Sequence, residues 1–215
     1  MKKLFKTHWV YFTGYILFII ITALILSLFS KQEIHLFINS YYSSVTDVFF
    51  KYVTNLGDGL AIAIVGIILL FINGRMALQV IVSGITSGLI AQLLKKVVFG
   101  PVARPSAFFK ELGIQLHYVS GVDLHTSFTF PSGHATAVFT LITSLIVLQK
   151  TKRLDILFFI LVILVSFSRV YLSQHFLADI FAGSIIGVIT SILTYYFLFI
   201  LWKDKFPRLD KPFIK

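Results

Sequence analysis

The 215-residue chain contains no cysteine, which excludes a disulfide framework, a thiol nucleophile and a thiolate zinc site. It is also poor in charge. Only 13% of its residues are Asp, Glu, Lys or Arg, about half of the roughly 25% that a soluble domain carries. Hydrophobic residues make up 57% of the chain, and phenylalanine alone occurs 23 times. These numbers exclude a disordered chain, because such chains are poor in apolar residues. Much of the protein must therefore face something other than water.

The chain has long apolar runs instead. A helix needs about 20 apolar residues to cross a bilayer core of about 30 Å. Six segments approach this length, and we expect an all-α integral membrane protein with spans at about 10–29, 57–73, 76–94, 131–148, 155–172 and 176–202. The run in the second, 59–72, is too short to cross alone and must extend backwards or lie in a thinned bilayer. The first run is too long for a cleaved secretion signal, so we expect an uncleaved anchor and one domain over 1–215.

The distribution of positive charge predicts the orientation. Six spans place both termini on one side of the membrane. The 19 Lys and Arg residues then divide into seven on the other side and twelve on the side of the termini: Lys2, Lys3, Lys6, Arg75, Lys150, Lys152, Arg153, Lys203, Lys205, Arg208, Lys211 and Lys215. The positive-inside rule places the termini in the cytoplasm. Most of the net charge of +10 then meets anionic lipid headgroups, so nucleic acid is not an expected partner. With no targeting signal, we expect a plasma membrane of bacterial type.

Two segments are expected outside the bilayer on the outer side. Apolar residues recur with a helical period over 34–54, which predicts an interfacial helix between the first two spans. Residues 95–130 form a polar outer loop. Ionisable groups gather where this loop and the outer helix ends meet, and such groups near membrane spans are usually functional. They are Lys95, Lys96 and Arg104, then the histidine of Pro131-Ser132-Gly133-His134, and then Arg169, His175 and Asp179.

The histidine and carboxylate of the last cluster have a spacing suited to nucleophilic catalysis. His175 and Asp179 are four residues apart and share one helical face. Asp179 can then accept a hydrogen bond from one ring nitrogen while the other stays free to attack. His134 remains to protonate a leaving group.

The remaining residues predict an anion site. Arg104 and Arg169 can each bind phosphate oxygens through two N–H groups, and Lys96 adds a point charge. Pro131 suits the first turn of a helix, so the backbone N–H groups from Ser132 to His134 are expected to point at an anion. Together with the histidines, this set is typical of phosphoryl transfer without a metal.

Two motifs resemble those of the type 2 phosphatidic acid phosphatase family. Pro131-Ser132-Gly133-His134 is similar to its second motif, and Ser168-Arg169-x5-His175-x3-Asp179 to its third. Its first motif is Lys, six residues, then Arg-Pro. Here seven residues separate Lys96 from Arg104-Pro105, Val97 occupies the expected position, and Lys95 is the alternative.

The resemblance implies how these residues act. His175 attacks phosphorus and forms a phosphohistidine, Asp179 orients it, and His134 is the general acid and base. Lys96, Arg104 and Arg169, with Ser132 and the Gly133 amide, hold the phosphoryl oxygens. No metal or other cofactor is implied. The expected substrates are lipid phosphates at the outer face: phosphatidylglycerophosphate, phosphatidic acid or undecaprenyl diphosphate.

Three other functions fit some of these residues. The protein could be dedicated to undecaprenyl diphosphate and the recycling of the cell-wall lipid carrier. It could be an anion-binding transporter, although no inverted repeat is visible. The trio of His134, His175 and Asp179 could hold a metal, although nearby Arg and Lys side chains would repel a cation.

Some residues are expected to have structural roles. His117 and His125 are predicted to be solvated or at the substrate rim, and His8 and His35 at the membrane interface. Asp58 is predicted to cap a helix. The pairs Gly84-x3-Gly88 and Gly183-x3-Gly187 are predicted to mark close helix contacts. The oligomeric state is open.

Overall fold

A computed structural model describes residues 1–214; Lys215, counted above with the cations of the termini, lies outside the described residues. The described residues form helices and no strand. The α-helices are α1 (Lys2–Thr7), α2 (Trp9–Leu28), α3 (Lys31–Ser40), α4 (Ser44–Val53), α5 (Gly59–Leu70), α6 (Gly74–Leu93), α7 (Pro105–Glu111), α8 (Gly133–Leu148), α9 (Asp155–Tyr171) and α10 (Leu177–Tyr195). Two short 3₁₀ helices are η1 (Thr54–Gly57) and η4 (Pro207–Asp210), and two short π-helices are η2 (Leu94–Val98) and η3 (Tyr196–Leu201).

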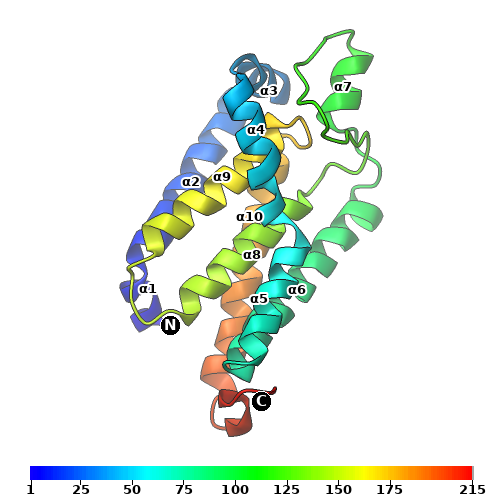
Figure 1. The fold of residues 1–215 in the computed structure, drawn as a ribbon. Coiled ribbons are helices and arrows are strands. Elements are labelled where there is room, and N and C mark those ends of the chain that lie inside the picture. The colour runs from blue at the N-terminus through cyan, green and yellow to red at the C-terminus, as the bar shows by residue number, and fades with distance from the viewer. Residues whose placement is uncertain (215) are drawn as a thin grey trace.

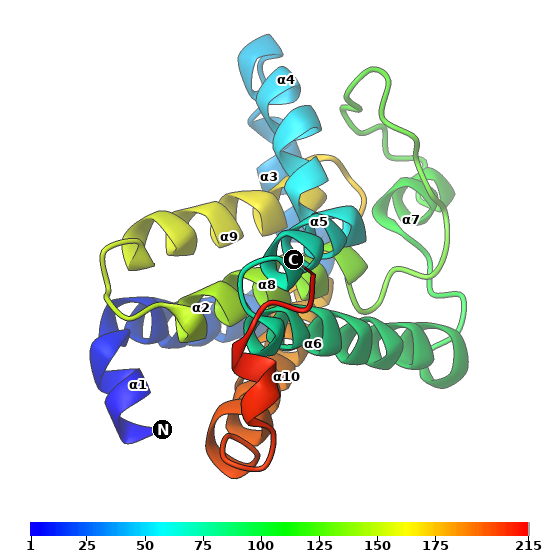
Figure 2. The same ribbon diagram turned by 60° about the horizontal axis from the view of Figure 1, so that its bottom comes forward.

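The centre of the bundle is the pair formed by α8 and α10, the most extensive helix contact in the structure. α6 packs on both helices, α9 on α8, and α5 on α6 (Figures 1 and 2). Glycine allows the central pair to approach closely. A Cβ added at Gly183 would lie 2.8 Å from the Ser132 carbonyl oxygen, and one at Gly187 would lie 2.7 Å from that of Thr136. This confirms the predicted helix contact. In the other pair, a Cβ added at Gly84 would lie 2.6 Å from the Ile62 side chain of α5, whereas a Cβ added at Gly88 would meet no atom within 4 Å.

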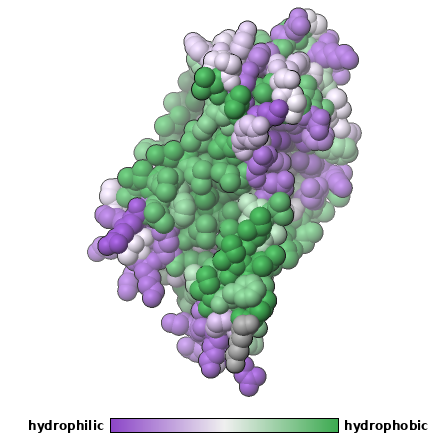
Figure 3. Space-filling view, in the orientation of Figure 1, coloured by the Kyte–Doolittle hydropathy of each residue, from purple (hydrophilic) through white to green (hydrophobic). Residues whose placement is uncertain are grey.

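Among residues 1–214, three helices are long and apolar enough to cross a membrane: Trp9–Leu28, Gly74–Val98 and Leu177–Leu201. A fourth would be the pair Ser44–Gly57 and Gly59–Leu70, which is bent by 51°. The other expected spans are helical, but α8 has 16 residues and α9 has 17. Apolar side chains cover the middle of the molecule, and hydrophilic ones gather at the end that carries α7 and at the end that carries the termini (Figure 3). The described part of the chain thus has three or four candidate spans by length and composition, so the expected six are not established.

The expected single helix over 34–54 is wrong. The structure has two helices there, α3 and α4, separated at residues 41–43. Each begins with a capping box, in which the Ser30 and Ser43 side chains accept hydrogen bonds from the backbone N–H groups of Glu33 and Thr46. Ser43 therefore starts a new helix within an apolar period that continues on both sides.

Two buried side chains, those of His8 and Arg75, make polar contacts at the end of the bundle that carries the termini (Figure 1). His8 is fully buried, and its Nδ1 lies 2.9 Å from Asp155 Oδ1 at the start of α9. Arg75, also fully buried, donates to Asp210 Oδ1 over 2.7 Å and to four backbone carbonyls beyond α10. Its guanidinium thus satisfies acceptors that a helix end leaves open.

Candidate active site

The predicted nucleophile and its carboxylate are in contact. His175 lies in the segment between α9 and α10, and its Nδ1 is 3.1 Å from Oδ2 of Asp179 in the first turn of α10. The same oxygen accepts the Phe176 backbone N–H over 2.9 Å. The His175 backbone N–H donates to the Arg169 carbonyl over 3.1 Å. The pair is therefore held by the start of α10 and the end of α9.

Burial lowers the pKa of His175 to about 4, against the opposing effect of Asp179. The positive charges of Arg104 and Arg169 lower it further. The ring is therefore neutral near pH 7. Because Nδ1 faces a carboxylate, the proton belongs on Nδ1, and Nε2 keeps its lone pair.

Thr129 contacts both members of this pair and was not predicted from the sequence. Its hydroxyl donates to Asp179 Oδ2 and lies 3.4 Å from His175 Nδ1. The side chain is 2% exposed. A loop residue has no periodicity that would indicate which side chains are buried. The one signal in the sequence was the position of Thr129, two residues before Pro131.

Both predicted arginines are buried beside this pair. Arg104 donates from Nε to the Ser127 carbonyl over 2.9 Å and from Nη1 to Gln174 over 3.1 and 3.2 Å. Arg169 donates from Nη1 to Thr54 Oγ1 over 2.8 Å. Its Nε is buried and has no partner among the described residues. A buried donor without a partner costs free energy, so the Arg169 Nε is a donor that the described residues leave unsatisfied.

The structure places Lys95 in this cluster and not Lys96. Lys95 is buried, and the charges of Arg104, Asp179 and Arg169 act on its ammonium group. Lys96 is exposed. The reason is η2, where the chain widens into a π turn and the Phe99 N–H bonds to the Leu94 carbonyl over 2.9 Å. The wider turn changes which side chain faces inwards, and such turns are frequent at functional sites.

The start of α8 differs from the expectation in one respect. Pro131 lies outside the helix, and Ser132 is the N-cap, whose Oγ accepts the Ala135 N–H over 3.3 Å. The Ser132 N–H donates to the Asp179 carbonyl over 3.1 Å, so it is not available to an anion. The first available N–H groups are those of Gly133 and His134. Of the eight predicted site residues, only Lys96 lies apart. His134, in the first turn of α8, is close enough to the others for the charges of Lys95, Arg104 and Arg169 to act on it.

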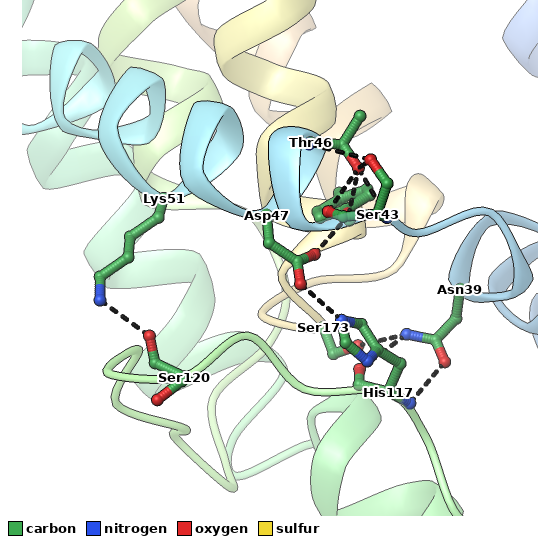
Figure 4. Close-up of polar contacts among 9 residues, drawn as sticks. Asn39, Ser43, Thr46, Asp47, Lys51, His117, Ser120 and Ser173 are labelled. Atoms are coloured by element: carbon green, nitrogen blue, oxygen red, sulfur yellow. Dashed lines mark hydrogen bonds and ion pairs between the residues drawn. The ribbon is translucent and has the colours of Figure 1, made fainter.

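The outer loop is fastened to α3 and α4 (Figure 4). His117 Nε2 lies 2.9 Å from Asp47 Oδ2, and its backbone exchanges two hydrogen bonds with the Asn39 side chain over 2.8 and 2.9 Å. Lys51 donates to the Ser120 carbonyl over 2.7 Å. His117, whose side chain is 25% exposed, thus anchors the loop as well as reaching solvent.

The structure also places His125, His35 and Asp58, the other residues with expected structural roles. His125 is exposed, as expected for a solvated residue, and lines two hollows, of about 310 Å³ beside Arg169 and about 380 Å³ beside Arg104. A larger hollow of about 660 Å³ lies beside α7 and not at the histidines. His35 is buried, and its Nε2 lies 3.1 Å from Ser173 Oγ. Asp58 occupies the N-cap position of α5 without a side-chain capping bond.

The metal hypothesis gains no support from the donor geometry. Within residues 1–214, no three His, Asp or Glu side chains are arranged to hold a metal ion. His134, His175 and Asp179 lie among cations, as the sequence had indicated.

The fold and the site define a class: a helical membrane protein in which a buried histidine–aspartate pair faces a ring of positive side chains. The chain belongs to the PAP2 superfamily, whose family model matches residues 76–203, from α6 to the end of η3. That range contains Lys95, Arg104, His134, Arg169, His175 and Asp179.

Two known proteins are similar to this chain. An undecaprenyl-diphosphatase of Sulfolobus acidocaldarius is 41% identical over 69 residues, which are 32% of this chain and 33% of the relative. The match thus spans about a third of the length of that curated relative. The crystal structure of LpxE from Aquifex aeolicus superimposes with a TM-score of 0.67 over 78% of this chain and 96% of that chain, at 24% identity. This likeness confirms the fold.

Proposed function

We propose that the protein is an integral membrane lipid phosphatase that releases inorganic phosphate from lipid phosphate monoesters or diphosphates through a phosphohistidine at His175. The observation that carries the proposal is the buried His175–Asp179 contact of 3.1 Å beside two buried arginines. A neutral imidazole held by a carboxylate is a nucleophile, and the arginines supply the charge that a phosphoryl group needs.

Each half of the reaction balances. The Nε2 lone pair of His175 forms the bond to phosphorus, and the bond to the leaving oxygen breaks with its electron pair on that oxygen. His134, protonated when the negative substrate is bound, gives this oxygen a proton. Water then attacks phosphorus and gives a proton to the neutral His134. The P–N bond breaks, its electrons return to Nε2, and phosphate leaves.

The phosphoryl oxygens would be held by the cations and by the start of α8. Lys95, Arg104 and Arg169 offset negative charge, and the Gly133 N–H points at the anion. Ser132 still has its hydroxyl proton to donate, because its Oγ only accepts from Ala135. The proposal includes no metal.

We place this single domain across the plasma membrane in six spans, with cytoplasmic termini and the site at the outer face. α8 and α9 measure about 24 and 26 Å, so they need a thinned bilayer or help from adjoining residues. At the interface, a lipid keeps its tails in the bilayer while its phosphate reaches His175. Phosphatidylglycerophosphate, phosphatidic acid and undecaprenyl diphosphate all meet this requirement.

A second candidate is a phosphatase dedicated to undecaprenyl diphosphate. The observation that favours it is the 41% identity to an undecaprenyl-diphosphatase, which covers a third of that relative. The two candidates differ in the ratio of activities on diphosphate and monoester lipids.

The test is phosphate release by detergent-purified protein with EDTA present, on the three lipids in parallel, with His175→Ala as the control. We expect activity that persists in EDTA and is lost in the variant, with ³²P-labelled substrate leaving label on wild-type protein. Loss of activity in EDTA would refute the metal-free mechanism. No release from any lipid by folded protein would refute the phosphatase and favour an anion transporter.

A further inference from the structure

Thr129 lies where the nucleophile and its carboxylate meet, although it belongs to neither motif. Its hydroxyl donates to Asp179 Oδ2 and is 3.4 Å from His175 Nδ1. Its own backbone N–H donates to the Val102 carbonyl over 3.2 Å, two residues before Arg104. The side chain is buried. Thr129 therefore connects the loop that carries Arg104 to the histidine–aspartate pair.

Three donors converge on one carboxylate oxygen. Asp179 Oδ2 faces the Thr129 hydroxyl, the His175 Nδ1 and the Phe176 backbone N–H. The Phe176 bond also caps α10, so by itself it holds the carboxylate to its own helix. The Thr129 hydroxyl is the donor that comes from outside the segment 175–179. It therefore restrains the rotation of the carboxylate relative to the loop.

We propose that Thr129 is a positioning residue for the phosphoryl transfer proposed above. Its hydroxyl holds the Asp179 carboxylate in the orientation that accepts the Nδ1 proton of His175 and leaves Nε2 free to attack. This assignment rests on the proposed function, because it presupposes His175 as the nucleophile. Outer hydrogen-bond partners of this kind orient the groups that do chemistry and affect their basicity.

Removing the hydroxyl has a consequence that a structural role would not have. Without Thr129 as a donor, the negative charge on Asp179 acts more strongly on His175, so the pKa of His175 rises. The acidic limb of the rate profile then moves to higher pH, because a larger fraction of the nucleophile is protonated. The other groups that face the pair are unchanged in such a variant: Lys95 from η2, Arg104 from the loop, His134 from α8, Arg169 from α9 and His35 from α3.

The experiment compares Thr129→Val, which keeps the shape, with Thr129→Ser, which keeps the hydroxyl. Thr190→Val is the matched control, because Thr190 is a buried threonine of α10 that bonds only to carbonyls of its own helix. Phosphate release from phosphatidic acid and from undecaprenyl diphosphate is measured from pH 4.5 to 8. We expect Thr129→Val to lose about 10- to 100-fold in kcat with KM changed less than about twofold. Its acidic limb should move to higher pH, while the serine variant and the control stay near wild type.

Two results would overturn the assignment. One is a valine variant with the kcat and pH profile of wild type. The other is a serine variant that loses as much as valine, with the acidic limb unmoved in both, which indicates that Thr129 only packs. Thr129→Ala serves the same comparison if the valine variant does not fold. Inactive wild-type protein would instead refute the proposed function and this assignment with it.

Discussion

Gly187→Ala tests whether the α8–α10 contact holds the site together. The added Cβ would lie 2.7 Å from the Thr136 carbonyl oxygen, 2.8 Å from the Thr140 nitrogen and 2.9 Å from Phe139 Cβ. Two of these three atoms are backbone of α8, so no side-chain rotation can relieve the contact. Ordinary contacts begin at about 3.4 Å. α8 must therefore move away from α10 by about half an ångström or more.

The size of the effect follows from two opposing terms. Overpacking of this kind costs about 1–3 kcal/mol. Alanine in place of glycine inside a helix returns about 1 kcal/mol. Gly88→Ala isolates the second term, because a Cβ there meets no atom within 4 Å. We expect the unfolding free energies of the two variants to differ by about 1–3 kcal/mol, with Gly187→Ala the less stable.

The assay is SDS-induced unfolding in mixed micelles, followed by phosphate release at a temperature where both variants are folded. Since α8 begins beside His134 and α10 beside Asp179, we also expect Gly187→Ala to lose activity while folded. Equal stability of the two variants would refute the close packing. A stable but inactive Gly88→Ala would indicate that the face of α6 near Gly88 has a partner outside the described contacts.

Three further predictions concern charge. Below pH 6.5 the unfolded chain protonates His175 while the folded protein, with the pKa of His175 near 4, does not, so stability falls as pH falls. Between pH 7.5 and 5 the wild type should lose about 2 kcal/mol more than His175→Gln in the same unfolding assay. Lys95→Ala should lower phosphate release about 100-fold and Lys96→Ala less than about twofold, because only Lys95 is buried in the cluster. Arg75→Lys should destabilise the protein by about 3 kcal/mol in SDS titration, because an ammonium cannot replace a guanidinium that binds four carbonyls and Asp210.

Each of these predictions has a contrary outcome. Parallel pH slopes for wild type and His175→Gln would mean that His175 is not buried as a neutral ring. Equal losses for the two lysine variants would contradict the inward turn at η2. Wild-type stability of Arg75→Lys would show that the carbonyls beyond α10 are satisfied by water.

The helices were largely predictable because their causes are local. The first span was predicted over 10–29 and α2 runs from Trp9 to Leu28; the third was predicted over 76–94 and α6 runs from Gly74 to Leu93. Apolar runs with caps at their ends determine such elements within a few residues. The number of spans was not predictable in the same way, because α8 and α9 are shorter than a bilayer core.

In the site, too, the local contacts were predictable and the contacts between distant segments were not. The spacing of four residues predicted the contact between His175 and Asp179, and the contact is local. It does not join two residues of one helix, because His175 lies just before α10 and Asp179 lies in the first turn of α10. Thr129, 50 residues from Asp179, and the choice of Lys95 over Lys96 depended on the tertiary structure. Contacts within a helix turn are set by backbone geometry. Contacts between a loop and a distant helix exist only after packing has brought the two together, and no period in the sequence records which loop side chain faces inwards.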